Sequence, residues 1–308
     1  GAGLKFAGPA GTTVAQNLEP EYITVAADSK TAWVSLQEAN AIAIIDLEAM
    51  RIEVKALGQK DWGQYLIDVS NEDEVASFRK LPNVYGLYQP DSIASYQWNG
   101  ATFIVSANEG DSRDWDAYSE DIRAADIIDP DELNKTFSTE LQGLYDATGG
   151  DDGLGRLKVT AALVDPDNDG VVEKLYAYGT RSFSIWNAQG QQVFDSGDQL
   201  EQLTKDLPQA KFNASHSGNA QDDRSDNKGP EPEGVIVAQF GQKHYAFIGL
   251  ERVGGVMVYD VSNPTRPVYE TYINTRNGNT GDLGPEGLHL VTADKSPNSK
   301  PLLVVGNE

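Results

Sequence analysis

Cysteine is absent from the 308 residues of the chain. This absence excludes disulfides, zinc–thiolate sites and a cysteine nucleophile, although it does not place the protein inside or outside the cell. Basic residues are also scarce, because 24 lysines and arginines stand against 47 aspartates and glutamates, a net charge of −23. Nucleic acid is therefore excluded as a partner, since binding its phosphates requires a basic face. No apolar run reaches the roughly 18 residues of a membrane span, so no transmembrane segment is expected.

Glycine, proline and tyrosine are plentiful, with 30, 14 and 13 copies, and apolar stretches with helical periodicity are few. This composition favours an all-β protein of short strands and many turns. Neither end of the sequence has the features of a natural terminus. We therefore expect the chain to come from a longer protein and to lack N-terminal repeats and one final strand.

Four segments, 19–38, 89–109, 231–251 and 284–308, repeat one pattern. Each has a proline followed by an acid, a strand, a polar turn, a second apolar strand and a closing glutamate. The acid pairs, 17, 18, 18 and 22 residues apart, are Glu21 and Glu38, Asp91 and Glu109, Glu233 and Glu251, and Glu286 and Glu308. Two antiparallel strands joined by a short turn bring both acids of a pair to the same end of the hairpin.

Two more strand patterns follow the first and third segments, at 41–47 and 52–57 and at 255–261 and 267–273. Four strands per unit are typical of a propeller blade. The sequence therefore predicts one β-propeller domain over 1–308, with about seven blades in the full protein, four to five of them in this chain. A fifth unit, without the acids, is expected at 174–195. A β-sandwich is the alternative, but it gives no reason for the acid pair to recur.

Two long segments interrupt the repeats. An acidic insertion at 119–154 is expected to be helical over 119–127 and 131–144. The polar loop 213–230 precedes the third repeat. Long loops on a rigid scaffold are frequent binding sites, so both segments are candidates for ligand contacts.

The eight repeat acids would converge at one mouth of the propeller channel. Converging carboxylates raise one another's pKa or require cations, and calcium, with six to eight oxygen ligands in flexible geometry, is a natural counter-ion. The alternative is that these acids only cap turns at the blade ends. Metal binding is favoured because the closing glutamate recurs as well, and no turn requires it.

A second calcium motif is expected in the loop 165–173. Asp165, Asp167, Asp169 and Glu173 occupy positions 1, 3, 5 and 9, with Gly170 at position 6. These positions suit calcium, but an EF-hand is excluded because position 12 is a tyrosine and strands are expected on both sides. A calcium-binding β-hairpin loop is predicted, and a metal-free turn is the alternative.

Basic residues beside the acids would suit a phosphate or sulfate group. The candidates for this role are Arg113, Arg252 and Lys228. Local ion pairs that offset the carboxylates are an equally good interpretation. The three histidines, His216, His244 and His289, are interpreted as structural or exposed. No Ser-His-Asp order or phosphate-binding glycine loop is present, so hydrolysis would need a metal-activated water.

Several long motifs resemble those of the choice-of-anchor I family. They are the segments 18–23, 37–43, 88–94, 107–111, 181–186, 224–234 and 246–260. The family includes mesenchyme-specific cell-surface glycoproteins linked to biomineralisation and bacterial proteins labelled atypical alkaline phosphatases. The resemblance implies an extracellular, periplasmic or cell-surface propeller. A weaker similarity, in the Pro-Glu-Gly hairpins, extends to propeller phytases and calcium-dependent propeller phosphatases.

Three functions are compatible with these features. In a phosphoester hydrolase, the eight acids would hold Ca²⁺ and a second metal such as Fe, Mg or Zn, while Arg113, Arg252 and Lys228 bind the phosphate of a small molecule. In a non-catalytic surface protein, the same acids would bind calcium to stiffen the scaffold or to contact an anionic surface or mineral. In an interaction module, the ligand would dock on the long loops. The neighbouring arginines favour hydrolysis, whereas the lack of a general acid favours the second function. The sequence therefore predicts a metal-dependent phosphoester hydrolase, with the non-catalytic surface protein as the alternative.

Overall fold

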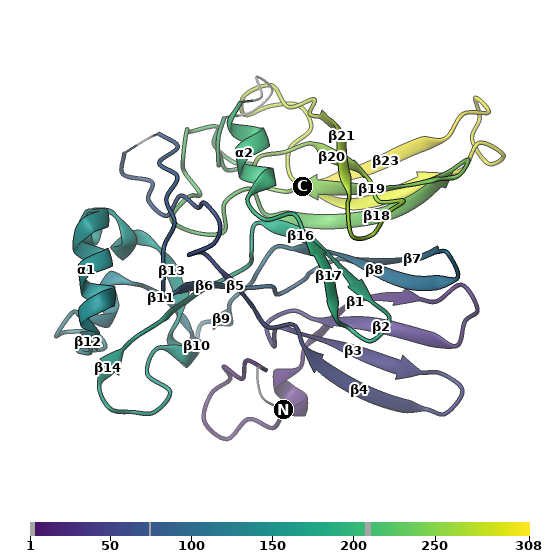
Figure 1. Cartoon of the computed structure of the whole chain (residues 1–308). Coiled ribbons are helices and arrows are strands. Elements are labelled where there is room, and N and C mark those ends of the chain that lie inside the picture. The colour runs from purple at the N-terminus through teal and green to yellow at the C-terminus, as the bar shows by residue number, and fades with distance from the viewer. Residues whose placement is uncertain (1–3, 74, 207–210) are drawn as a thin grey trace.

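The computed structural model describes all residues except 1–3, 74 and 207–210, and it is mostly β (Figure 1). Three four-stranded antiparallel sheets and one two-stranded sheet carry the repeats. The first sheet contains β1 (Pro20–Val25), β2 (Thr31–Leu36), β3 (Ala41–Asp46) and β4 (Arg51–Ala56). The third contains β18 (Pro232–Phe240), β19 (Lys243–Leu250), β20 (Val256–Asp260) and β21 (Val268–Ile273). The last pairs β22 (Pro285–Val291) with β23 (Leu302–Asn307). The four strands predicted after the first and third repeats are thus confirmed.

The second sheet differs from the prediction. It contains β7 (Ile93–Trp98), β8 (Ala101–Asn108), β16 (Ser182–Asn187) and β17 (Gln192–Asp195), in the order β17-β16-β8-β7. The expectation of a separate fifth unit at 174–195 is wrong, because β16 pairs with β8 along its whole length, from Ser182 opposite Asn108 to Asn187 opposite Phe103. The described residues therefore contain four repeat units.

The chain between β8 and β16, together with two strands that precede β7, forms a subdomain at one side of the repeats (Figure 1). Its five-stranded sheet has the order β11-β13-β15-β6-β5, from β11 (Asp121–Arg123), β13 (Lys158–Thr160), β15 (Leu175–Ala177), β6 (Val84–Leu87) and β5 (Gln59–Asp61). Short pairs β9 (Asp114–Trp115) with β10 (Tyr118–Ser119), and β12 (Thr136–Phe137) with β14 (Val171–Val172), lie beside it. Trp62, Val84, Leu141, Val159 and Val172 are among the residues of its own apolar core.

The helical content of this insertion is smaller than predicted. A helix over 119–127 is wrong, because Ile122 in β11 pairs with Val159 and only the 3-10 turn Ala125–Ile127 follows. The second helix, α1, runs over Thr139–Thr148 rather than 131–144. It starts late because 136–137 pair with β14, after which Ser138 caps the helix by accepting a hydrogen bond from the Leu141 N–H at 3.2 Å. The other α-helix, α2 (Gln199–Lys205), follows β17.

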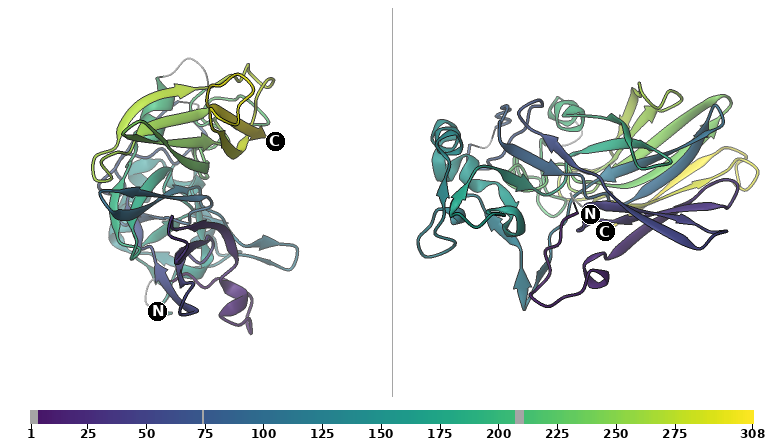
Figure 2. Two further views of the ribbon diagram at one scale, coloured as in Figure 1. Left: turned by 90° about the vertical axis from the view of Figure 1, so that its right-hand side faces the viewer. Right: turned by 60° about the horizontal axis from the view of Figure 1, so that its bottom comes forward.

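The first strands of the four units are neighbours, so the sheets lie side by side in an open arc (Figure 2). β1 contacts β7, β7 and β8 contact β18, and β18 contacts β22. Apolar residues fill the space between adjacent sheets, among them Trp33, Ile104 and Trp186 between the first and second, and Phe183 and Tyr259 between the second and third. This burial supplies most of the driving force that holds the units together.

One backbone irregularity recurs at the start of each unit. The residue before the proline has a left-handed φ in all four repeats: 33° at Glu19, 40° at Gln89, 51° at Glu231 and 61° at Gly284. A break in the pairing register follows the proline in β1, β18 and β22. The carbonyl before the proline then accepts the N–H of the closing glutamate, at 2.9 Å from Glu251 to Glu231 and 3.0 Å from Glu308 to Gly284. Both acids of a pair therefore lie at the same end of the hairpin.

Candidate metal-binding site

The acids of neighbouring repeats lie close enough to perturb one another, and we call the eight repeat carboxylates the acid cluster. Burial, followed by the charges of Glu109 and Glu21, raises the pKa of Asp91 to about 7. Burial and the charges of Glu109, Glu251 and Asp91 raise the pKa of Glu233 to about 9. Asp91, Glu109, Glu233 and Glu251, from the second and third repeats, thus form the centre of the cluster.

The other four acids lie around this centre. Glu286 is exposed beside Glu233, and its charge also raises the pKa of Glu233. Glu21 adjoins Asp91. The pKa of Glu38 is raised to about 7 by burial, with smaller contributions from the charges of Glu19 and Asp111. Glu308 is linked to the centre through His216, whose Nε2 lies 3.1 Å from Glu308 Oε2 and whose Nδ1 lies 3.8 Å from Glu251 Oε1.

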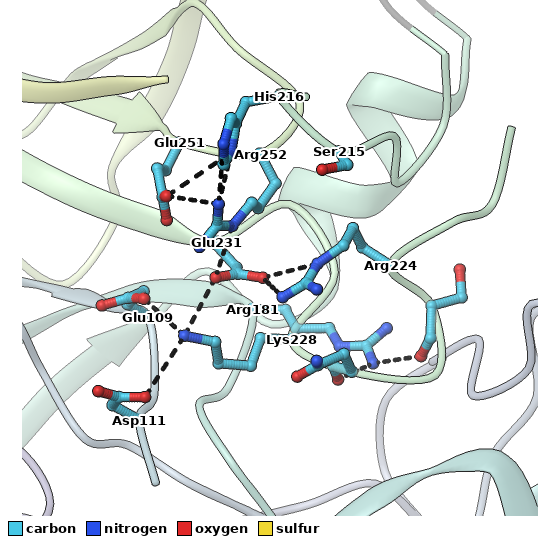
Figure 3. A network of polar contacts seen from close by, with 12 residues as sticks. Glu109, Asp111, Arg181, Ser215, His216, Arg224, Lys228, Glu231, Glu251 and Arg252 are labelled. Atoms are coloured by element: carbon cyan, nitrogen blue, oxygen red, sulfur yellow. Dashed lines mark hydrogen bonds and ion pairs between the residues drawn. The ribbon is translucent and has the colours of Figure 1, made fainter. Parts of the chain in front are cut away.

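Beside the centre lies a buried ion network around Glu231 (Figure 3). Glu231 is fully buried and is contacted by three cations. Arg224 Nε lies 3.0 Å from Oε1, while Lys228 Nζ and Arg252 Nε lie 3.1 and 3.2 Å from Oε2. Burial alone would raise the pKa of Glu231, but the three positive charges outweigh it and lower the pKa to about 2. The carboxylate is therefore ionised at any physiological pH.

The same cations also bind members of the acid cluster. Lys228 Nζ lies 2.6 Å from Glu109 Oε1, and Arg252 Nη1 lies 2.9 Å from Glu251 Oε1. Carboxylates hold the pKa of Lys228 above its usual range despite its burial. Two of the three side chains predicted to bind phosphate, Lys228 and Arg252, are thus engaged with protein carboxylates, the arrangement expected for local ion pairs.

Arg113 lies apart from this network. Its Nη2 lies 3.1 Å from Glu19 Oε2 and donates to the Asn17 carbonyl at 2.8 Å, and the whole side chain is buried. Its charge acts on Glu38, the outer acid of the first repeat. Arg113, Lys228 and Arg252 therefore do not share a carboxylate, and the structure does not bring the three together as one phosphate clamp.

Two glycines hold Glu109 in position where the chain leaves the second sheet and returns to it. Gly110 (φ 88°) and Gly179 (φ 67°) lie back to back, and a Cβ on Gly179 would lie 2.0 Å from the Glu109 carbonyl oxygen. Neither the close approach nor the left-handed φ is open to other residues without strain. Gln37 then fixes the carboxylate by donating from Nε2 to Glu109 Oε2 at 2.9 Å.

The acid cluster offers carboxylate oxygens, the type of ligand that hard cations such as calcium prefer. Among the described residues, Asp91 and Glu233 have no ion-pair partner, and Glu233 Oε2 is buried without a hydrogen-bond donor. The nearby triad of Glu109, Glu231 and Glu251 can bring one oxygen each within 4.8 Å of one another, but Lys228 and Arg252 already neutralise it. Within the acid cluster, a hard cation would therefore fit best beside Asp91 and Glu233, whose carboxylates offer oxygen ligands and are not neutralised by an ion pair among the described residues.

The predicted calcium loop at 165–173 is only partly assembled. One oxygen each from Asp165, Asp167 and Asp169 lies within 4.8 Å of the others, whereas Glu173 is exposed and lies outside this group. The expectation of a β-hairpin is wrong, because a 3-10 turn, Ala161–Leu163, precedes the loop and β14 pairs in parallel with β12. Lys135 Nζ lies 2.7 Å from Asp165 Oδ2, and this hydrogen bond is the main cause of the lowered pKa of Asp165.

Two residues of the site were not predicted. Glu231 precedes the proline of the third repeat and so falls just outside the Pro-acid motif, although the acid Glu19 at the same position of the first repeat was a signal. His216 was interpreted as structural or exposed, yet it contacts Glu251, Glu308 and Arg252. Burial, followed by the charge of Arg252, lowers its pKa, so its imidazole is neutral near pH 7.

The chain is similar to one known family and to several named proteins. A family model described as the choice-of-anchor I domain matches residues 1–264. Gigasin-3a of Magallana gigas is 34% identical over 156 residues, covering 44% of this chain and 55% of that protein. The mesenchyme-specific cell surface glycoprotein of Strongylocentrotus purpuratus is 26% identical over 291 residues, covering 85% of this chain and 37% of that protein. The chain thus spans about half or less of the length of these relatives.

Among solved structures, Kuenenia stuttgartiensis hydrazine synthase matches 93% of this chain and 43% of its own, at 14% identity and a TM-score of 0.36. A likeness at that level carries no conclusion about fold or function. No helix in the described part of the chain has the length and apolar character needed to cross a membrane.

Proposed function

Because the chain belongs to the choice-of-anchor I family, we propose that it is part of an extracellular or cell-surface β-propeller that binds calcium through its acid cluster. The name of the Strongylocentrotus purpuratus relative, a cell surface glycoprotein, supports the location. The open arc of similar sheets, each with its first strand at the centre, supports propeller blades.

One observation carries the calcium proposal. Asp91 and Glu233 lie together in a partly buried position and lack an ion-pair partner among the described residues. Burial and the neighbouring carboxylates raise the pKa of both side chains far above its usual range. Such a pair must either take up protons or bind a cation. Near pH 8, calcium would allow the carboxylates to remain ionised. Glu109, Glu251, Glu21 and Glu286, whose charges act on the pair, are the candidates for further ligands.

Phosphoester hydrolysis is the second candidate. It is favoured because Arg252 and neutral His216 contact Glu251 and Lys228 contacts Glu109, so basic groups lie beside the acid cluster. A divalent metal bound there would supply Lewis-acid chemistry. For a phosphate to bind, however, Arg252 or Lys228 would have to exchange its contact with Glu231. Glu231 would then keep only two of its three cations, and weakening this buried network opposes phosphate binding. We therefore favour the non-catalytic role, in which calcium stiffens the scaffold or meets an anionic surface.

Calorimetric titration with calcium after EGTA treatment, followed by assays of phosphomonoesters and phosphodiesters, tests both candidates. Saturable calcium binding without turnover is the expected result. Turnover that EGTA abolishes and calcium restores would favour hydrolysis instead. Absence of any calcium binding by the folded protein would overturn the proposed function.

A further inference from the structure

A histidine and two glutamates from three separate segments converge beside the acid cluster. His216 lies in the polar loop 213–230, Glu251 follows β19 and Glu308 follows β23. One nitrogen or oxygen atom from each lies within 4.8 Å of the other two. The side chain of His216 is 24% exposed and that of Glu308 is 41% exposed, so a dissolved ion can reach the group. Unlike the rest of the acid cluster, this group offers a nitrogen ligand as well as carboxylate oxygens.

The contacts of His216 determine which ring nitrogen carries the proton. Arg252 Nη1 contacts His216 Nδ1 and lies 2.9 Å from Glu251 Oε1 (Figure 3). Because arginine can only donate, Nδ1 accepts, and the proton of the neutral ring is on Nε2, 3.1 Å from Glu308 Oε2. The lone pair of Nδ1 and Glu251 Oε1 are therefore both turned toward one positively charged group.

A buried arginine holds the two sides of this group together. Arg276 is 7% exposed and donates from Nη2 to the Ser215 carbonyl at 2.7 Å and from Nη1 to the Arg252 carbonyl at 3.0 Å. Ser215 and Arg252 are the sequence neighbours of His216 and Glu251. The backbone on both sides is thus fixed, and it places His216 opposite Glu251.

The spacing and the chemistry of these ligands suit a transition metal. In a tetrahedral site, bonds of about 2.0–2.1 Å to nitrogen and 2.0–2.2 Å to oxygen place the two ligand atoms roughly 3.4 Å apart. His216 Nδ1 lies 3.8 Å from Glu251 Oε1, so a small movement brings both to one ion. Imidazole is a preferred ligand of zinc and related ions, whereas calcium is bound through oxygens.

We propose that His216 Nδ1 and the carboxylates of Glu251 and Glu308 bind a divalent transition metal such as zinc. The ion would join the polar loop to the third and fourth repeats. This site differs from the proposed calcium site in its ligands and in its ion, and it requires no calcium at Asp91 and Glu233.

Arg252 is the group with which the metal competes. Its Nη1 contacts both His216 and Glu251, whereas its Nε lies 3.2 Å from Glu231 Oε2. Metal binding therefore displaces Nη1 but leaves the contact of Nε with Glu231 in place. The buried network around Glu231 then keeps its three cations.

The test is calorimetric titration of the chelator-treated chain with zinc chloride and, separately, with calcium chloride. His216→Gln should weaken the binding of one zinc equivalent by at least about tenfold. His289→Gln, the same substitution at an exposed histidine of β22, should leave zinc binding unchanged. Equal zinc affinities in the two variants would overturn the proposal.

The calcium titration separates this site from the acid cluster. His216→Gln should bind calcium as the unmodified chain does, since it keeps every carboxylate. Zinc binding that depends on His216, in a chain that binds no calcium, would count against the proposed function and not against this site.

NMR of the imidazole nitrogens provides a second test on the unmodified chain, which decides if His216→Gln does not fold. The chain has only three histidines, so their signals can be assigned. Without metal, His216 should carry its proton on Nε2, and zinc should shift its Nδ1 signal while those of His244 and His289 stay in place. A His216 signal that zinc does not move would also overturn the proposal.

Discussion

Lys228 Nζ lies 2.6 Å from Glu109 Oε1, although 119 residues separate the two in the sequence. The contact joins the closing acid of the second repeat to the loop that enters the third. Because Lys228 also contacts Glu231, at 3.1 Å, one ammonium group ties two neighbouring sheets together at the end where the acids gather.

Glu231→Gln should strongly destabilise the protein. The substitution removes the charge that three buried or half-buried cations share, and losing one partner of a buried ion pair costs about 3–5 kcal/mol. Urea unfolding would measure the loss in free energy of unfolding. Asp223→Asn, at an exposed position directly before Arg224, is the matched control and should change stability little. A loss below about 1 kcal/mol for Glu231→Gln would show that the network is only a surface feature.

Glu233→Gln combined with Glu251→Gln should reduce calcium affinity at the acid cluster by at least tenfold. Each substitution removes one carboxylate that could bind the cation while keeping the side-chain size. Calorimetric titration measures the change, and Glu53→Gln, on the exposed face of β4, provides a control with the same chemistry. Equal affinities in the double variant and the control would show that calcium does not bind there.

Stability without divalent ions should fall as the pH rises from 6 to 9. The pKa of Glu233 in the folded protein, about 9, lies above its ordinary value of 4.5, so the folded state holds more protons than the unfolded state between these values. The stabilising contribution is complete below pH 4.5 and is lost as the pH passes 9. Calcium should flatten this dependence because it replaces the proton.

Urea unfolding at several pH values, in EGTA and in excess calcium, measures this effect. Glu233→Gln should have a flatter profile than the unmodified protein in EGTA. Parallel profiles with and without calcium would contradict the idea that ion and proton compete for the same carboxylates.

Lys135→Met should increase calcium affinity at the loop 165–173. Lys135 Nζ lies 2.7 Å from Asp165 Oδ2 and neutralises part of the charge of the aspartate triad. Its removal leaves the triad free for a cation. Protection of the loop from proteolysis by calcium is a suitable readout, with Lys174→Met, in the exposed segment after the loop, as control. If calcium protects neither variant, this loop is a metal-free turn.

Features that depend on local sequence could be predicted. The proline-acid hairpins are visible because a proline, a turn and alternating strands lie within about twenty residues, and β3, β4, β20 and β21 follow directly. The strands β16 and β17 were placed in a unit of their own because their partner, β8, lies far back in the chain. The helix expected at 119–127 failed for a similar reason, since pairing with Val159 overrides local propensity.

The candidate site shows the same division. The acid cluster follows from the repeat, whereas the network around Glu231 depends on how the loop 213–230 folds over the second and third sheets. Nothing in the spacing of Arg224, Lys228 and Arg252 reveals that all three contact one carboxylate. Long loops hold such contacts because tertiary packing alone sets their course.

The place of the insertion has a consequence for the order in which the chain folds. The sheet β1-β2-β3-β4 closes through turns of a few residues, whereas β16 must pair with β8 although Ser182 follows Asn108 by 74 positions. Closing so long a loop is entropically costly until the insertion has its own core. We expect pulsed hydrogen exchange to show amide protection in β2 and β3 before β16. The second sheet should be completed only after the core of the subdomain has formed.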